Sequence, residues 1–199
     1  MESAQFTYYL LFFASTVSFI AGFFYKKYKT ILWIESTITC IASFIYYYYL
    51  TFVKNELKVL NNLRYIDWSL TTPLMLISLS LILSLLTKIP FSMPLTITVI
   101  LLDLFMLSFG YAGEIGWMTK QIADVCGFIP FIALFALLYK KYKPKGTAGF
   151  LFFTYLLVWS GYGVVYLLDE TNMNIGYNIL DSISKAMISL FISGFILIN

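Results

Sequence analysis

Apolar residues follow one another in seven long runs along the chain, and polar residues gather in the short stretches between these runs. Each run is close to the roughly 20 residues that a helix needs to cross the hydrocarbon core of a bilayer. We place the runs at about 5–25, 30–52, 63–87, 91–111, 119–140, 148–168 and 175–198. The pattern predicts an all-α membrane protein, a bundle of seven transmembrane helices that forms a single domain over residues 1–199.

The charges between the predicted spans are distributed unequally. Three alternate loops, at residues 26–29, at Lys88 and at residues 140–145, collect eight lysines and no acidic residue. The other loops hold acidic residues such as Glu56 and Glu114. Because loops rich in lysine stay in the cytoplasm, we expect the N-terminus to be extracellular and the C-terminus cytoplasmic.

The composition supports this topology. The chain is 60% hydrophobic and 12% charged, with a mean hydropathy of +0.84, which is too apolar for a soluble domain of this length. We therefore expect an integral, multi-pass membrane protein whose main partner is the lipid bilayer. The net charge of +3 indicates no nucleic-acid partner, because the lysines lie beside spans, where topology already explains them.

One cationic residue, Lys185, lies near the middle of the last predicted span, where a charge is costly. Asp181 precedes it by one helical turn, so both side chains project from nearly the same face. One interpretation is a structural ion pair inside the membrane. The other is that Lys185 is a covalent anchor, because burial favours the neutral amine that condenses with an aldehyde to a Schiff base.

A polar stripe runs along the third predicted span, at spacings of three, four and seven residues: Arg64, Asp67, Thr71 and Ser78. On an otherwise apolar helix such a stripe faces the bundle interior. Arg64 is the only arginine in the sequence, and its guanidinium can bridge carboxylates. A protonated Schiff base in apolar surroundings needs a carboxylate counterion. The charges of Asp67, Asp181, Arg64 and Lys185 balance if all four share one site.

Residues 64–74 read Arg-Tyr-x-Asp-Trp-x-x-Thr-Thr-Pro-Leu, and the last span contains Asp-x-x-x-Lys at 181–185. These two motifs resemble the signature of the microbial (type 1) rhodopsins. Further matches are Asp103, Met106 and Gly110 in the fourth span and Trp159-Ser-x-Tyr162 in the sixth. The resemblance covers the whole chain. It implies all-trans retinal bound through Lys185, no metal site and no enzymatic activity.

The same resemblance implies roles for individual residues. Asp67 would be the primary proton acceptor, Asp181 the second counterion and Arg64 the outer gate. The residues implied to hold the cofactor besides Lys185 are Trp68, Thr72, Met75, Asp103, Met106, Trp159, Tyr162 and Tyr166. Taken one by one, the aromatic residues among them could equally be core packing. Their joint spacing around a lysine favours the pocket.

Several positions depart from the pattern of the proton pumps in this family. Ser78 stands where such pumps commonly carry a proton-donating carboxylate, and Met173 aligns with an outer release glutamate. Gly163 replaces a usual proline of the sixth span; with Gly161 it either loosens this helix or allows close helix packing. Glu35 in the second span partly replaces the missing proton-donating carboxylate if it approaches Ser78. The alternative is that it snorkels to the membrane surface.

The triplet Asp67, Thr71 and Ser78, together with Glu35 and the short loops, looks most like the viral rhodopsins, in particular a group described as light-gated cation channels. We therefore expect a cation channel whose path is lined by Glu35, Ser78 and Asn178. The alternatives are an outward proton pump with Glu35 as donor, and a sensory photoreceptor. The expected partners are transported cations or protons, with a homo-oligomer left open.

Overall fold

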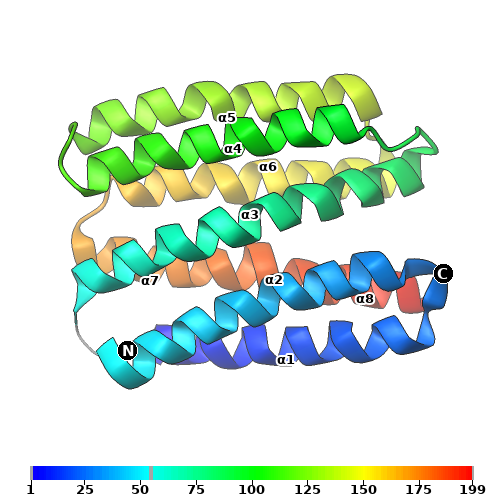
Figure 1. Cartoon of the computed structure of the whole chain (residues 1–199), viewed down its shortest axis with the longest axis horizontal. Helices are drawn as coiled ribbons and strands as arrows, with labels where there is room; N and C mark the ends of the chain where they lie inside the picture. Colours follow the sequence, from blue (N-terminus) through cyan, green and yellow to red (C-terminus); the bar gives the residue numbers. More distant parts are fainter. Residues whose placement is uncertain (1, 54–55, 199) are drawn as a thin grey trace. The chain divides into compact units, whose positions relative to one another are not determined.

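The computed structural model describes residues 2–53 and 56–198, and these residues contain helices and no strands (Figure 1). Seven helices in the described ranges are long and apolar enough to cross a membrane. The first six spans comprise α1 (Glu2–Phe24), α2 (Lys29–Tyr48), α3 (Leu57–Thr87), α4 (Met93–Glu114), α5 (Lys120–Tyr142) and α6 (Gly146–Tyr166). The seventh span comprises α7 (Glu170–Asp181), η3 (Ser182–Met187) and α8 (Ile188–Ile198). The predicted fold class is thereby confirmed, and the orientation of the termini stays a prediction.

The chain divides into two compact units. The first unit consists of Met1–Met75 and Glu170–Asn199, and the second consists of Leu76–Asp169. Helix α3 contributes to both units, with the boundary after Met75. The prediction of a single domain over residues 1–199 stays a prediction.

Two helices begin earlier than the hydropathy pattern predicts. Helix α3 begins at Leu57 rather than near 63, and α7 begins at Glu170 rather than near 175. The added turns contain polar residues, and they bury Asn61 and Asn174, which are 3% and 5% exposed. An amphipathic turn lowers the mean hydropathy of a window without interrupting the helix, so hydropathy places such ends too late.

In the first unit, helix α1 contacts one helix that runs antiparallel to it and one span that runs parallel to it. It runs antiparallel to α2, where Ser15 Oγ donates to the carbonyl of Ser36 at 3.0 Å, and the two helices lie side by side in Figure 1. It runs parallel to the seventh span, where Thr7 contacts Ser182 and Ser18 contacts Ser189. Small residues and hydroxyls at these contacts allow helices to approach closely within a membrane.

The seventh span changes its winding where it carries Lys185. Segment η3 is π-helical, with hydrogen bonds five residues apart in place of four, between the regular helices α7 and α8. Short π-helical segments inside α-helices occur frequently at functional sites. The spacing of Asp181 and Lys185 predicts that both lie on one helix face, and their side chains do contact each other. The hydropathy pattern does not predict the π-helical winding of this segment.

Aromatic rings pack between α5 and α6 in the second unit. The ring of Phe135 on α5 lies 5.6 Å from that of Phe152 and 5.9 Å from that of Trp159, both on α6. Gly163 on α6 packs against α5, because a Cβ atom there would lie 2.5 Å from Cε2 of Phe128. Close packing therefore accounts for Gly163, one of the two interpretations that the sequence left open.

Candidate functional site

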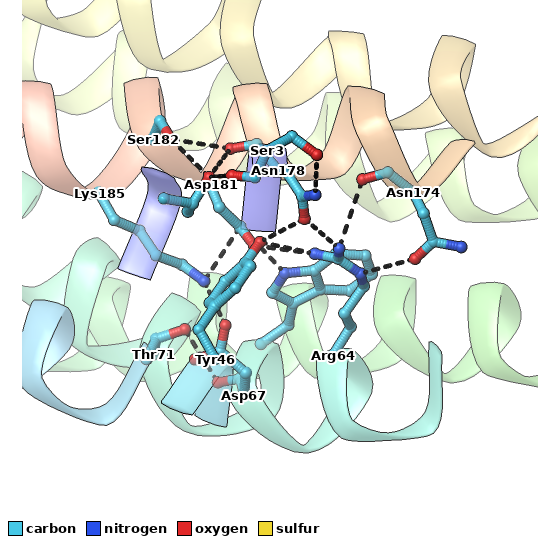
Figure 2. Close-up of polar contacts among 12 residues, drawn as sticks. Ser3, Tyr46, Arg64, Asp67, Thr71, Asn174, Asn178, Asp181, Ser182 and Lys185 are labelled. Carbon is cyan, nitrogen blue, oxygen red and sulfur yellow. Dashed lines mark hydrogen bonds and ion pairs between the residues drawn. The ribbon is translucent and has the colours of Figure 1, made fainter. Parts of the chain in front are cut away.

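Lys185 belongs to a cluster of buried charges in the first unit (Figure 2). Its Nζ contacts Oδ2 of Asp67 and lies 3.1 Å from Oδ1 of Asp181. The side chains of Lys185 and Asp67 are each 1% exposed, and that of Asp181 is 0% exposed. An ammonium at this depth is tolerated because two carboxylates face it.

Asp181 connects this ammonium to a second cation. Its other oxygen, Oδ2, lies 3.2 Å from Nη1 of Arg64, whose side chain is 2% exposed. The structure thus brings together the four charged residues that the sequence analysis placed in one site, Asp67, Asp181, Arg64 and Lys185. Two carboxylates and two cations give a cluster without net charge. Removing one partner would leave an uncompensated buried charge, which is strongly unfavourable.

Arg64 is surrounded by polar and aromatic groups. Its Nη1 donates to the hydroxyl of Tyr46 at 2.9 Å, and Nη2 donates to Oδ1 of Asn178. Asn174 accepts from Nε through Oδ1 and from Nη2 through its backbone carbonyl, at 3.4 Å each. The guanidinium carbon also lies 5.5 Å and 5.4 Å from the ring centres of Tyr46 and Tyr177. These contacts, in addition to Asp181, hold the guanidinium in one orientation.

Tyr46 is a site residue that the sequence motifs do not identify. A run of four tyrosines such as 46–49 is typical of an aromatic anchor at the membrane interface, but Tyr46 faces the interior instead. Its side chain is 2% exposed, and its hydroxyl lies 2.8 Å from Oδ2 of Asp181. A signal was present in the sequence, because the buried residues Glu35, Thr39, Ala42, Tyr46 and Tyr49 share the spacing of one helix face.

Three of the residues predicted to hold the cofactor follow Asp67 on α3. Nε1 of Trp68 donates to Oδ1 of Asp181 at 3.3 Å, and its ring lies 5.0 Å from that of Tyr177. Thr72 Oγ1 donates to the carbonyl of Trp68 at 2.7 Å, and Met75 is 1% exposed. Thr71 makes the corresponding bond to the carbonyl of Asp67 at 2.9 Å. Both hydroxyls thus find their hydrogen-bond partners within α3, the helix that carries Asp67.

Six of the predicted residues belong to the second unit: Ser78, Asp103, Met106, Trp159, Tyr162 and Tyr166. Ser78 and Asp103 are fully buried, and Trp159 is 7% exposed. The hydroxyl of Tyr166 donates to the carbonyl of Gly110 at 2.8 Å, so this ring connects α6 to α4. The approach of these residues to Lys185 stays a prediction.

Glu35 is buried within the protein, with 1% of its side chain exposed. The alternative that it snorkels to the membrane surface is therefore wrong. It lies beside Ser36, which contacts Ser15 of α1, and its carbonyl accepts from Thr39. Its predicted approach to Ser78 stays a prediction, since Ser78 belongs to the second unit.

Hydroxyl groups continue the polar face of the seventh span beyond Lys185. Ser189 and Ser193 follow Lys185 by four and eight residues, and the Oγ of Ser18 lies 2.8 Å and 2.9 Å from theirs. All three serines are 0% exposed. Their sequence positions alone do not mark them as site residues, because serines are common at contacts between membrane helices.

The model of the bacteriorhodopsin-like protein family matches residues 1–197. The chain belongs to this family of microbial rhodopsins. It is 30% identical over 147 residues to a green-light absorbing proteorhodopsin of Gamma-proteobacterium EBAC31A08, a match that covers 65% of this chain and 58% of that relative's length. Members of the family bind retinal as their chromophore and are mainly ion transporters or photoreceptors. The predicted family, cofactor and multi-pass membrane location are thereby confirmed.

Solved structures extend this similarity to the whole fold. The crystal structure of viral rhodopsin OLPVRII matches with a TM-score of 0.93 and 28% identity, covering 98% of this chain and 95% of that one. The proton pumping rhodopsin AR2 from the marine alga Acetabularia acetabulum matches with a TM-score of 0.74 and 23% identity, covering 96% and 92%. The second likeness concerns the fold alone. The rhodopsin is most like viral rhodopsins, as predicted, and its assembly into a homo-oligomer stays a prediction.

The residues around Lys185 fit retinal as a covalently bound group. The lysine amine is the nucleophile that an aldehyde requires, and it lies among buried groups rather than at the surface. Asp67 Oδ1 is buried and has no hydrogen-bond partner among the described residues, so it can accept a further donor. With two carboxylates beside it, the nitrogen of Lys185 can keep a positive charge after attachment.

Proposed function

We propose that this rhodopsin is a light-gated cation channel with retinal attached to Lys185. One observation carries the proposal: buried polar side chains continue along the seventh span on both sides of Lys185. Toward the Glu170 end they are Asn174, Asn178, Asp181 and Ser184, and toward the Ile198 end they are Ser189 and Ser193. A channel needs polar groups along both halves of its path, because ions cross the two halves in one open state.

Retinal bound at Lys185 would supply the absorption of light and the change of shape that follows it. Asp67 Oδ2 contacts this nitrogen and is the group placed to take its proton. Once the nitrogen is neutral, Asp181 faces Arg64 as its remaining cationic partner within the cluster. Asp181, which was attracted by both Lys185 and Arg64, is then attracted by Arg64 alone. Arg64 and its partners can move, and water can enter beside them.

The carboxylates set the charge of the transported ion. Asp181 lies on the Glu170 side of Lys185, and Glu35 lies on α2 beside Ser36, which pairs with α1 close to Ser18. Buried carboxylates on both sides of the midpoint attract cations and exclude anions. By the orientation that the lysines predict, the half that contains Arg64 is the outer half and the half that contains Glu35 is the inner half.

A second candidate is a light-driven outward proton pump. The observation that favours it is the burial of Glu35, because a buried carboxylate on the inner side could return a proton to Lys185 in place of Ser78. Against it stand Ser78 itself and Met173, which is apolar and 1% exposed at the position aligned with an outer release glutamate. Two departures from the pump pattern thus favour the channel.

Vesicles containing the retinal-loaded protein separate the two candidates. We expect illumination to dissipate a preset proton or sodium gradient in either direction, and to build no gradient from equal solutions. Lys185→Ala vesicles serve as the control for light effects that do not pass through the protein. Formation of a proton gradient from equal solutions, abolished by a protonophore, would identify the pump instead.

A further inference from the structure

Asn178 makes several hydrogen bonds that its expected role as a residue lining the ion path does not explain. It is 4% exposed and lies on α7, one turn before Asp181 (Figure 2). Its Oδ1 accepts from Nη2 of Arg64 and lies 3.0 Å from the hydroxyl of Tyr46. Its Nδ2 donates to Oγ of Ser3 at 2.9 Å. A single side-chain amide thus joins α7 to α1, α2 and α3.

The backbone of the same residue is also engaged. Its carbonyl accepts from Oγ1 of Thr7 at 3.1 Å and from Oγ of Ser182 at 2.9 Å. These bonds fix the position of Asn178 relative to α1, so its amide is a rigid support rather than a mobile side chain. The two halves of the amide also have fixed directions, because Oδ1 faces donors and Nδ2 faces an acceptor.

The two terminal nitrogens of Arg64 have different partners. Nη1 is held by Tyr46 and Asp181, whose charge and hydrogen bonds depend on the state of Lys185. The shorter contact of Nη2 is with Asn178, an uncharged residue whose affinity for a guanidinium does not change when a proton leaves Lys185. One side of Arg64 therefore responds to the reaction at Lys185, and the other side does not.

We propose that Asn178 is the latch of the outer gate: its amide oxygen holds Arg64 in the resting position, and its amide nitrogen ties that position to Ser3 on α1. The proposal rests on the proposed function in so far as Arg64 gates a path for ions. Asn178 acts through Arg64 and is a positioning residue. A neutral latch suits this place, because a third carboxylate would give the cluster a net negative charge and hold Arg64 more firmly.

The single arginine of the sequence makes the latch directly observable. Protein labelled with [¹⁵N]arginine and reconstituted with retinal in lipid gives nuclear magnetic resonance signals from Arg64 alone. In the dark we expect two separate Nη signals, because the two nitrogens have different partners. In Asn178→Leu, which is similar in size and has no polar side-chain atom, we expect these signals to merge at a temperature that keeps them apart in the unchanged protein. Two separate, unshifted signals in this variant would overturn the proposal.

Two further variants test the two halves of the amide. Ser3→Ala removes the acceptor for Nδ2 and leaves Oδ1 in place, so the Nη signals should stay separate. Merging in Ser3→Ala would show that the tether alone holds Arg64 and would overturn the assignment to Oδ1. Asn178→Asp keeps the shape and adds a charge. Since charged hydrogen bonds are stronger, we expect the light-induced change of the Arg64 signals to slow by about five- to tenfold.

Asn178→Asp also keeps the proposal open to refutation if Asn178→Leu does not fold, since an unchanged rate in Asn178→Asp would contradict the latch. The readout does not depend on ion flow. A protein with the expected Arg64 signals and no cation current would refute the channel and leave the latch. Cation current with Arg64 signals indifferent to Asn178→Leu would refute the latch alone.

Discussion

The two halves of the first unit, on either side of Lys185, are both polar but in different ways. The half toward Glu170 contains Arg64 and Asp181, joined by an ion pair and surrounded by amides. The half toward Ile198 contains Ser18, Ser189 and Ser193, joined by neutral hydroxyl contacts. Hydrogen bonds between charged groups are roughly twice as strong as neutral ones. For the proposed channel, we therefore expect the charged half to be the main barrier in the dark and the hydroxyl half to hydrate more easily.

The largest effect is expected at the residue between the two halves. Lys185→Ala should abolish the visible absorption band after retinal is added, because the attachment point is lost. Absorption spectra of the purified protein measure this, and Lys120→Ala, at the start of α5, is a matched control that should keep the band. A red-shifted, hydroxylamine-sensitive chromophore that persists in Lys185→Ala would contradict the attachment.

The charged half should be the more sensitive to loss of a partner. Asp181→Asn leaves Arg64 buried without its carboxylate, and we expect a loss of about 3–5 kcal/mol in the free energy of unfolding. The midpoint of thermal bleaching measures the change. The double variant Arg64→Gln/Asp181→Asn should recover part of the loss, because it removes both charges. Additive losses in the double variant would show that the pair does not interact as the geometry indicates.

Asp67 should act mainly on the colour of the pigment. In Asp67→Asn the carboxylate in contact with Lys185 becomes a neutral amide, so the positive charge on the chromophore is less firmly held at the nitrogen. We expect an absorption maximum at longer wavelength at neutral pH, measured on the purified pigment. An unchanged spectrum would assign the role of main counterion to Asp181.

In the hydroxyl half, Glu35 distinguishes the channel from the pump. If it lines the inner path, Glu35→Gln should change the conductance or the choice among cations, with a small effect on the photocycle. If it returns the proton to Lys185, the late phase should slow by roughly 10²–10⁴-fold and recover with added azide. Flash photolysis and photocurrents on this variant decide between the two, and azide-rescued kinetics would favour the pump.

The smallest effect is expected from a single hydroxyl. Ser193→Ala removes one neutral contact with Ser18, at a cost of about 0.5–1.5 kcal/mol in the free energy of unfolding. The midpoint of thermal bleaching should therefore fall much less than in Asp181→Asn. A loss as large as that of Asp181→Asn would remove the distinction between the two halves.

The sequence predicts the charges of this site better than its neutral groups. A charge inside an apolar span demands a partner, so Lys185 indicates Asp181, and the stripe on α3 indicates Arg64 and Asp67. No comparable demand identifies Tyr46, because four consecutive tyrosines do not reveal which of them faces the interior. Tyr46 lies on the same helix face as Glu35, but this is a weaker signal, because it identifies Tyr46 only if the face of Glu35 is already known to face the interior.

Other features depend on contacts between helices distant in the sequence. The bond from Asn178 to Ser3 joins residues 175 positions apart, and no local pattern specifies it. The π-helical winding of η3 likewise does not follow from a periodicity of 3.6 residues, which predicts a regular helix through Lys185. The number of membrane-length helices, by contrast, follows from the length of the apolar runs, and for residues 2–53 and 56–198 it agrees with the prediction.

The central claim is that light opens one path through both halves at the same time. Voltage-clamp recording of the retinal-loaded protein under light, over a series of membrane potentials, tests it most directly. The account predicts a photocurrent that changes sign at a reversal potential, and that this potential shifts when the cation gradient is changed. A steady outward current that keeps its sign over the usual range of potentials would contradict the channel and show that one half stays closed while the other is open.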